Sequence, residues 1–499
     1  MELSVIYSRA LAGIDAPPVR VETHLSNGLP AFHIVGLPET AVREAKDRVR
    51  SALINSHFEF PDRRITVNLA PADLPKGGGR FDLPIALGIL AASHQVPQDQ
   101  LARHEFVGEL ALDGSLRPVP GVVAAGLASR AEKRTLVVAD DSAPRAAIVP
   151  GAKIIGAPDL LTLCAHLNGA VPLQPAMATA WAKPTAYPDL ADVVGQAPAR
   201  RALEIAAAGG HHLLLHGPPG TGKSLLASRL PGILPQAESE EVLTNLVLQD
   251  AQGLGEKVSV SPQRPLRTPH HSASAAALAG GGARPRPGEI SLAHGGVLFL
   301  DELPEFNRQC LEVLREPLET GAITLSRANQ KVTYPARFQL VAAMNPCPCG
   351  YLGDDSRPCR CHPDQIKRYR GRISGPLLDR IDLHVSVGRL PSEKLLAPCG
   401  NEEPSAEVRA RVARARERQQ QRQGCMNNDL ASGRLLEVCA LEREAKALLT
   451  NAGDALKLSG RGIHRTLRVA RTIADLDESA VVAAAHIGEA LAFRSESNA

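Results

Sequence analysis

Leu213-Leu-Leu-His-Gly217-Pro-Pro-Gly-Thr-Gly-Lys223-Ser224 is the stretch that decides the fold of this 499-residue chain. An apolar strand, Leu213–His216, runs into a loop of the form GxxxxGK[ST], and a helix is expected over Leu225–Leu230. Such a unit turns backbone N–H groups and the positive end of a helix toward phosphates. We predict that Lys223 reaches the β- and γ-phosphates of ATP and that Ser224 ligates Mg²⁺. The full predicted ATP-binding set is Gly217, Pro218, Pro219, Gly220, Thr221, Gly222, Lys223, Ser224 and Asp301.

Two later strand-like runs end in polar side chains. Gly296–Leu300 is followed by Asp301 and Glu302, and Phe338–Met344 is followed by Asn345. Because the carboxyl ends of parallel strands meet at one edge of a sheet, we expect these side chains beside the phosphates. Asp301 would hold Mg²⁺, Glu302 would polarise the attacking water, and Asn345 would sense the γ-phosphate. Taken alone, an acidic pair after an apolar strand is more often a solvated strand end, and the alternative for Asn345 is the start of a turn before Pro346.

Composition limits the class of protein. The chain is 44% hydrophobic and 22% charged, which is typical of a globular protein of two or three domains. A net charge of +3 gives no global argument for nucleic-acid binding, so any such argument must rest on local patches. There is no run of about 18 apolar residues and no signal-peptide pattern, so we expect no membrane partner and a cytoplasmic location. The 9 cysteines are an odd number, which argues against a disulfide framework.

Four regions are expected from the pattern of strands and helices. Residues 1–169 are mixed α/β, with strands over 19–23, 32–35, 65–68 and 135–138 and a helix over 40–55. Residues 170–188 are rich in Pro and Ala and are interpreted as a linker. Residues 189–390 alternate strands and helices, which predicts an α/β core with a parallel sheet. Residues 391–499 show only helical patterns, over 405–423, 431–452, 462–476 and 478–493.

The cysteines are unevenly distributed, and four of them fall within one short segment. These are Cys347, Cys349, Cys359 and Cys361. Gly350, Gly353 and Pro358 would let the segment fold back, which predicts a closed tetrahedral zinc site that braces a loop. Catalysis by this ion is not expected, because four protein ligands leave no open position. The spacing is tighter than the usual C-x₂-C, so reduced thiols remain an alternative, and His362 is an alternative ligand.

Long strings in the chain resemble the magnesium-chelatase-like AAA+ ATPases, and within them the ComM/YifB subgroup. The strings are Arg284–Glu302, Ala343–Gly350 and Ser374–Asp382, and the resemblance extends over almost the whole chain. It implies a P-loop core, a helical lid and a homo-hexameric ring with ATP sites between subunits.

The same resemblance assigns roles to arginines. It implies that Arg380 is an arginine finger and that Arg461, with Arg465 as second choice, is the sensor arginine of the lid. The plainer reading of Arg380 is a salt bridge to Asp379 or Asp382.

Two basic features are candidate DNA contacts. Residues 321–335 have β-rich arms and a polar tip at 326–330, which predicts a hairpin. In related rings such a hairpin points into the central pore, where Arg327 and Lys331 would grip phosphates; a solvated hairpin is the alternative. Arginines on one face of the helix over 405–423 would contact DNA or pack on a ring neighbour. His270 and His271, in a segment resembling a helix insertion of this clade, are expected to support loop structure.

The N-terminal region resembles the Lon-protease-like α+β domain, of the ribosomal S5 domain 2-like fold. The matching segments are Gly77–Leu87 and Val107–Gly121. A Lon protease needs a Ser nucleophile and a Lys, but Arg80–Pro84 has no Ser and Pro120–Ala124 has no Lys. We therefore expect a scaffold without peptidase activity. Lys76, Arg80 and Arg117 are weighed as DNA contacts against ordinary surface charges.

The resemblance implies an ATP-dependent DNA motor. The expected activity is that of a hexameric helicase promoting branch migration in homologous recombination during natural transformation, acting on single-stranded or branched DNA. The main alternative is a chelatase-type motor that remodels a protein partner or inserts a metal. A Lon-type protease is disfavoured by the missing dyad, and a non-enzymatic DNA-binding scaffold by the complete ATP motif.

Overall fold

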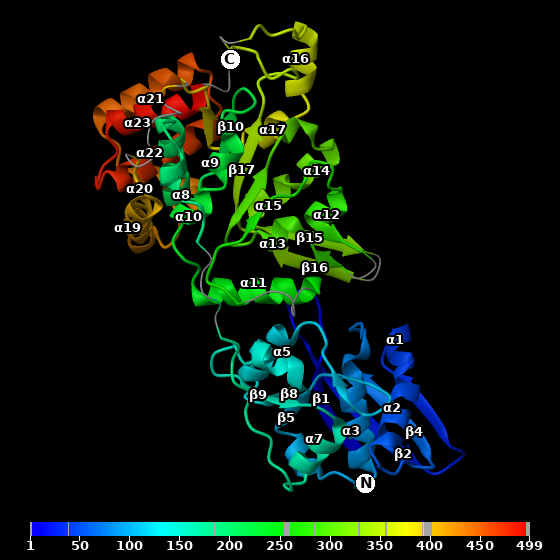
Figure 1. Ribbon diagram of the computed structural model, residues 1–499. Coiled ribbons are helices and arrows are strands. Elements are labelled where there is room, and N and C mark those ends of the chain that lie inside the picture. The colour runs from blue at the N-terminus through cyan, green and yellow to red at the C-terminus, as the bar shows by residue number, and fades with distance from the viewer. Residues whose placement is uncertain are drawn as a thin grey trace. The chain divides into compact units, whose positions relative to one another are not determined.

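The computed structural model describes residues 2–37, 39–180, 182, 186–253, 260–282, 285–327, 330–354, 357–391, 393 and 402–495. The chain forms two compact units (Figure 1). The first comprises Met1–Lys183 with Ser239–Ser261, and the second comprises Pro184–Glu238 with Pro262–Ala499. Within the described ranges, no helix is both long and apolar enough to cross a membrane.

The first unit is built on two small sheets. The larger has the order β1 (Leu3–Arg9), β2 (Pro18–Ser26), β4 (Arg64–Ala70) and β3 (Ala31–Val35), with only β3 and β4 parallel. Burial alternates along β2, so one face of this sheet faces the core. The second sheet is parallel, with the order β5 (His104–Phe106), β8 (Thr135–Ala139) and β9 (Lys153–Ala157). A hairpin joins β6 (Glu109–Leu110) to β7 (Leu116–Arg117).

Helices cover these sheets. Every residue of α3 (Asp82–Ala92) is buried, and α3 packs on β1 and β2. The other helices of this region are α1 (Thr40–Arg43), α2 (Ala45–Asn55), α4 (Gln98–Leu101), α5 (Val122–Ala131), α6 (Ala143–Ala146) and α7 (Leu160–Leu167).

The four strands predicted here are present, each somewhat longer than expected. The helix predicted over 40–55 is interrupted at Glu44, which separates α1 from α2. Lys76 is fully buried and Arg80 is nearly so, and the Arg80 guanidinium donates to the Pro120 carbonyl at 2.6 Å. Burial lowers the pKa of Arg80 to about 10. Treating these two cations as surface groups that contact DNA was therefore wrong, because both serve the interior of the fold.

Helix α11 (Ser239–Gln252) belongs to the first unit although the sequence places it inside the ATPase region. Its Asp250 carboxylate, which is 2% exposed, accepts from Arg145 Nε at 2.7 Å and from the Val123 amide at 3.3 Å. The chain therefore passes from one unit to the other three times, between residues 183 and 184, 238 and 239, and 261 and 262.

The second unit has a five-stranded sheet in which all strands are parallel. The order is β11 (Leu266–Arg267), β14 (Val297–Leu300), β17 (Gln339–Met344), β10 (Leu213–His216) and β18 (Leu383–Ser386). In register, Leu214 pairs with Ala342 on one side and with His384 on the other. The parallel-sheet core that the alternating pattern predicts is thus present, and strand β10, which leads into the phosphate loop, lies between two buried neighbours.

Short helices and two hairpins surround this sheet. The helices are α8 (Ala197–Gly209), α9 (Lys223–Ala227), α10 (Leu230–Ile233), α12 (Ala275–Ala279), α13 (Glu289–Leu292), α14 (Arg308–Val313), α15 (Arg315–Thr320), α16 (Pro363–Arg370) and α17 (Gly375–Leu378). The hairpins are β12 (Gly280–Gly281) with β13 (Arg286–Pro287), and β15 (Ala322–Arg327) with β16 (Gln330–Pro335).

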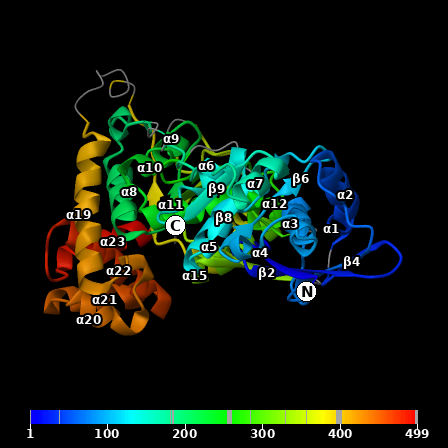
Figure 2. The same ribbon diagram turned by 90° about the horizontal axis from the view of Figure 1, so that it is seen from below.

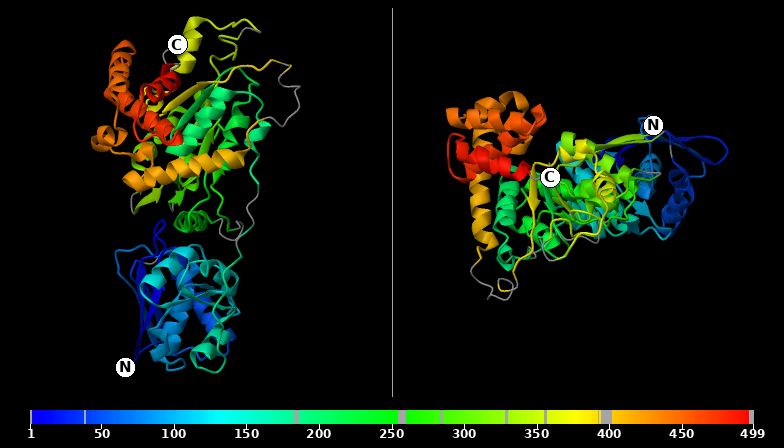
Figure 3. Two further views of the ribbon diagram at one scale, coloured as in Figure 1. Left: turned by 90° about the vertical axis from the view of Figure 1, so that its left-hand side faces the viewer. Right: turned by 90° about the horizontal axis from the view of Figure 1, so that it is seen from above.

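The C-terminal part of the second unit is helical, as predicted (Figure 3). It contains α19 (Ser405–Gln423), α20 (Leu435–Cys439), α21 (Arg443–Ala455), α22 (Gly460–Leu476) and α23 (Ala484–Ser495). The single helix predicted over 431–452 was wrong, because Ala440 adopts a left-handed φ of 43° and separates α20 from α21. The helix predicted from 478 begins only at Ala484.

Helix α19 lies alongside α8 (Figure 2), and its arginines bind the chain's own atoms. Arg416 donates to the Ala207 carbonyl at 2.6 Å, and Arg411 pairs with Glu204 at 2.6 Å. Arg422 pairs with Asp475 of α22 at 2.5 Å. These contacts favour an internal packing role over either alternative expected for the basic face.

Candidate nucleotide site

The predicted phosphate loop joins β10 to α9 and curls around its own lysine. Gly220 and Gly222 have left-handed φ values of 77° and 91°, a conformation that glycine adopts without steric cost. The Lys223 ammonium donates to the carbonyls of Gly217 and Pro218, both at 2.8 Å. Burial lowers the pKa of Lys223, with Asp301 and Glu302 opposing that effect. The loop therefore holds its own lysine against two backbone carbonyls.

Ser224 and Asp301 meet although they are far apart in sequence. Ser224 Oγ donates to Asp301 Oδ2 at 2.5 Å, which joins the start of α9 to the end of β14. Hydroxyl and carboxylate oxygens are the ligands that Mg²⁺ prefers. These two side chains therefore fit a magnesium ion next to the phosphate loop.

Asn345 follows β17, the strand next to β10. Its Oδ1 accepts from Lys223 Nζ at 3.1 Å. The Gly217 amide also donates to the Met344 carbonyl at 3.3 Å. The structure thus brings together the loop lysine, the serine–aspartate pair and the amide from three strand ends.

Glu302 has a partner that the sequence did not reveal. Its carboxylate lies 3.2 Å from His271 Nδ1, and its backbone is left-handed with φ of 53°. Such a conformation costs a non-glycine residue roughly 1–2 kcal/mol. Both side chains are substantially exposed, at 37% for His271 and 52% for Glu302. His271 was expected only to support a loop, and no spacing rule in the sequence links it to Glu302.

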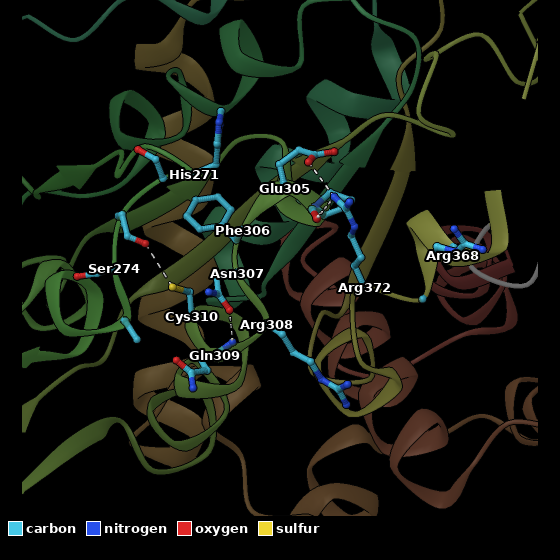
Figure 4. A pocket seen from close by; sticks show the side chains of 15 residues that line it. His271, Ser274, Glu305, Phe306, Asn307, Arg308, Gln309, Cys310, Arg368 and Arg372 are labelled. Carbon is cyan, nitrogen blue, oxygen red and sulfur yellow. Dashed lines mark hydrogen bonds and ion pairs between the residues drawn. The ribbon is translucent and has the colours of Figure 1, made fainter. Parts of the chain in front are cut away.

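A pocket of about 920 Å³ opens beside this pair (Figure 4). His271 and Phe306 line it together with three arginines, Arg308, Arg368 and Arg372. Arg372 pairs with Glu305, another residue of the lining, at 2.8 Å. The pocket therefore carries positive charge close to the glutamate that is expected to act on water.

The predicted arginine finger is held within its own chain. Arg380 is 6% exposed, pairs with Glu319 of α15 and donates to the Pro376 carbonyl at 2.5 Å. The plainer reading named Asp379 or Asp382 as its partner, and the structure shows Glu319 instead. Its Nε is buried and has no hydrogen-bond partner among the described residues.

The two candidate sensor arginines differ sharply. Arg461 is exposed in the first turn of α22 and has no ion pair within the described part of the chain. Arg465 donates to Asp382 Oδ1 at 2.6 Å and to the Arg380 carbonyl at 2.7 Å. Burial acts to raise the pKa of Asp382, but Arg465 and the neighbouring His211 and His212 outweigh it and hold the pKa well below its usual range. Arg465 therefore connects α22 of the helical region to the residues just before β18.

The four clustered cysteines converge. Cys347 Sγ lies 3.4 Å from Cys349 Sγ and 3.7 Å from Cys359 Sγ, and Cys349 and Cys359 are 3.6 Å apart. One ligand atom from each of these residues and from Cys361 lies within 4.8 Å of the others. We call these residues the four-sulfur group.

The predicted hairpin is present as β15 and β16, with Ala322 paired to Pro335 at its base. Tyr334 is buried and donates to the Pro285 carbonyl at 2.8 Å, which anchors the hairpin. Lys331 is exposed. The side chain of Arg327 and residues 328–329 lie outside the described residues.

Comparisons with known proteins show the family of this chain. The family model "Magnesium chelatase, subunit ChlI" matches residues 189–395. Two related models match residues 21–142, "Subunit ChlI of Mg-chelatase", and residues 402–494, "Magnesium chelatase, subunit ChlI C-terminal".

Individual relatives span nearly the whole chain. It is 51% identical to the competence protein ComM of Haemophilus influenzae, over 99% of this chain and 98% of that protein. It is 50% identical to the YifB protein of Escherichia coli, over 99% of this chain and 97% of that protein. Identity to the magnesium-chelatase subunit ChlI of Chlorella vulgaris is 25%, over 38% of this chain and 48% of that protein. The chain belongs to the magnesium-chelatase-like AAA+ ATPases, in the subgroup that contains ComM and YifB.

Proposed function

We propose that this protein is an ATP-dependent DNA motor that works as a homo-hexameric ring. The observation that carries the proposal is the convergence of Lys223, Asn345 and the Ser224–Asp301 pair at adjacent strand ends. Family membership implies ATPase activity, and the relative named as a competence protein supports a role in DNA uptake.

The residues divide the work of hydrolysis. Lys223 and the loop amides of residues 217–224 bind the β- and γ-phosphates, and Ser224 and Asp301 hold Mg²⁺. Bound magnesium neutralises the charge that develops on the phosphates. Glu302 orients the attacking water, and Asn345 aligns it against the γ-phosphate.

The neighbouring subunit completes the site. Arg380 stabilises the transition-state charge in the next protomer, for which its guanidinium must leave Glu319. Arg461 reports the bound nucleotide to the lid. Its exposure supports this role, whereas Arg465 is already engaged with a buried aspartate.

DNA is the substrate that ATP hydrolysis moves. The hairpin of β15 and β16 carries Arg327 and Lys331 to phosphates of a single strand or of a branched junction. The activity is that of a helicase that promotes branch migration during homologous recombination in natural transformation, in the cytoplasm. A chelatase-type motor acting on a protein partner or a metal is the second candidate, which the chelatase family models favour.

The proposed domains are a Lon-like scaffold at 1–169, a linker at 170–188, the ATPase core at 189–390 and the lid at 391–499, with residues 239–261 leaving the core to join the first compact unit. Two separate sheets in the N-terminal region, one of them parallel, support an α+β scaffold. We assign a structural zinc ion to the four-sulfur group, because thiolates are the ligands that zinc prefers in closed sites.

ATPase assays on single-stranded, duplex and branched DNA test the proposal. Wild-type hydrolysis should rise with branched or single-stranded DNA. Lys223→Ala should weaken ATP binding, and Glu302→Gln should bind ATP but retain about 1% of turnover or less. Hydrolysis by Glu302→Gln at the wild-type rate contradicts the assigned role. ATPase activity that ignores every DNA favours the chelatase-type reading.

A further inference from the structure

We infer that zinc bound by the four-sulfur group supports the phosphate loop from outside, so that metal occupancy sets the affinity for ATP. This inference rests on the proposed ATP site and adds a second ion that never touches the nucleotide. It depends on the chemistry of the four sulfurs and on the contacts that connect their loop to the site.

The sulfurs are spaced for a metal. Zinc–sulfur bonds of about 2.3 Å in a tetrahedron place sulfurs about 3.8 Å apart. The observed separations of 3.4, 3.6 and 3.7 Å approach that value and far exceed a disulfide bond of about 2.0 Å. Backbone amides already face the sulfurs, since the Cys349 amide lies 3.4 Å from Cys361 Sγ and the Cys361 amide 3.5 Å from Cys359 Sγ. Such donors stabilise thiolates around a metal.

The loop that holds the sulfurs begins at the nucleotide site. Asn345, which contacts Lys223, is separated from Cys347 only by Pro346. The Pro346 carbonyl also accepts from Arg370 Nε of α16 at 3.2 Å. The position of Asn345 therefore depends on how firmly the following cysteine is held.

The same loop also contacts the phosphate loop directly. Gly350 has a left-handed φ of 84°, and a Cβ added there would lie 2.7 Å from Pro219 Cδ. Pro219 is the third residue of the phosphate loop, and its ring occupies the place that a side chain at position 350 would need. Displacement of Gly350 would change the space available to Pro219.

A third contact fastens the loop to the strand on the far side of the phosphate loop. Asp354, whose side chain is 4% exposed, pairs with Arg389 at 3.0 Å, just beyond β18. The Arg389 guanidinium also lies 5.8 Å from the centre of the Tyr351 ring. The segment from 346 to 354 thus connects the end of β17, the phosphate loop and the exit of β18.

Zinc binding would cross-link this segment, through Cys347 and Cys349, to Cys359 and Cys361. Four thiols lose their protons to solvent as Zn²⁺ binds, and the filled site carries two net negative charges. Without the ion, the four cysteines are no longer held together, the chain next to them regains conformational freedom, and the contact between Gly350 and Pro219 is no longer enforced. Nucleotide binding must then supply the cost of ordering the loop, which lowers the apparent affinity.

Metal removal and restoration test the inference on the full-length protein. Zinc content is measured as isolated, after treatment with a thiol-directed mercurial and chelator, and after adding back reductant and ZnCl₂. Affinity for a fluorescent ATP analogue with Mg²⁺ should fall by about tenfold on depletion and return on reloading. Unchanged affinity in zinc-free, folded protein overturns the inference, as does isolation without zinc. Loss of binding in the zinc-loaded wild type would instead defeat the proposed ATP site.

Substitutions at two glycines distinguish the effect of the contact with Pro219 from the effect of zinc binding. Gly350→Ala should keep zinc yet weaken nucleotide affinity by about threefold to tenfold, because its Cβ meets Pro219. Gly353→Ala is the matched control, since Gly353 has a similar φ of 76° and a Cβ there meets nothing within 4 Å. Both variants place an alanine at a left-handed φ, and both should retain zinc. Equal nucleotide affinities of the two variants would overturn the proposed contact.

Discussion

Replacement of Arg465 by alanine should destabilise the second unit severely. Arg465 donates to Asp382 at 2.6 Å, and the Asp382 side chain is fully buried. Removing one member of a buried ion pair leaves the other charge uncompensated, which costs about 3–5 kcal/mol. The His212 amide still donates to Asp382 Oδ2 at 3.0 Å, so the loss should fall toward the lower part of that range. Urea unfolding followed by circular dichroism measures the change.

Two comparison variants make this test decisive. Arg461→Ala, at an exposed position on the same helix, should change the free energy of unfolding by no more than about 0.5 kcal/mol while reducing ATP turnover. Combining Arg465→Leu with Asp382→Asn should recover at least half of the loss, because no unpaired charge remains. If Arg465→Ala costs less than about 1 kcal/mol and abolishes turnover, Arg465 is the sensor and the structural reasoning fails.

Three further outcomes are expected. Lys331→Ala should weaken DNA-stimulated ATPase activity and reduce the slope of log DNA affinity against log salt concentration by about 1. Lys446→Ala, at an exposed position on α21, should leave both quantities unchanged. Equal effects of the two substitutions would show that the hairpin does not contact DNA. His271→Ala should alter turnover by no more than about fivefold, because an exposed pair with Glu302 is worth about 1 kcal/mol at most; a hundredfold change in steady-state ATPase rate would show a direct catalytic part. Burial lowers the pKa of His212 to about 4 from an ordinary 6.5. Between these two pH values the unfolded chain binds a proton at His212 and the folded chain does not. The free energy of unfolding should therefore fall by up to about 3 kcal/mol as pH drops from 6.5 to 4. His212→Asn, which keeps an acceptor for the Leu340 amide, should flatten that part of the pH profile, and an unchanged acid limb in unfolding experiments would refute the assignment.

The elements that the sequence predicts well are those with strong local signals. The apolar runs of β10, β14 and β17 form neighbouring parallel strands. They were predictable because each is a short, continuous apolar stretch that ends at a polar or glycine residue. The helix over 405–423 was predicted with its observed bounds, since Gly424 ends it in a left-handed conformation. The break at Ala440 carries no glycine or proline, and the backbone there bonds instead to Val482, which is distant in sequence: the Val482 amide donates to the Ala440 carbonyl at 3.3 Å.

Side-chain partners are less predictable than strands. The meeting of Ser224 with Asp301 follows from parallel-strand geometry, which any such loop and strand share. Pairing of Glu302 with His271, and of Arg380 with Glu319, depends on tertiary approach between segments with no fixed spacing. The burial of Arg80 was missed for the same reason. Its charge suggests surface exposure, and only the fold shows that the Pro120 carbonyl accepts a hydrogen bond from its guanidinium.

The assignment of α11 to the first unit has a practical consequence for dissecting the protein. A shortened chain starting after the Pro- and Ala-rich stretch would keep α11 but lose Arg145 and the Val123 amide, which donate hydrogen bonds to Asp250. An aspartate that is 2% exposed in the intact chain would then have no such partners, and its helix would show apolar residues such as Val242 and Leu246 to water. Truncations at that point are therefore expected to aggregate. The second unit is best produced with residues 239–261 replaced by a short polar loop, and the first unit with these residues attached to it.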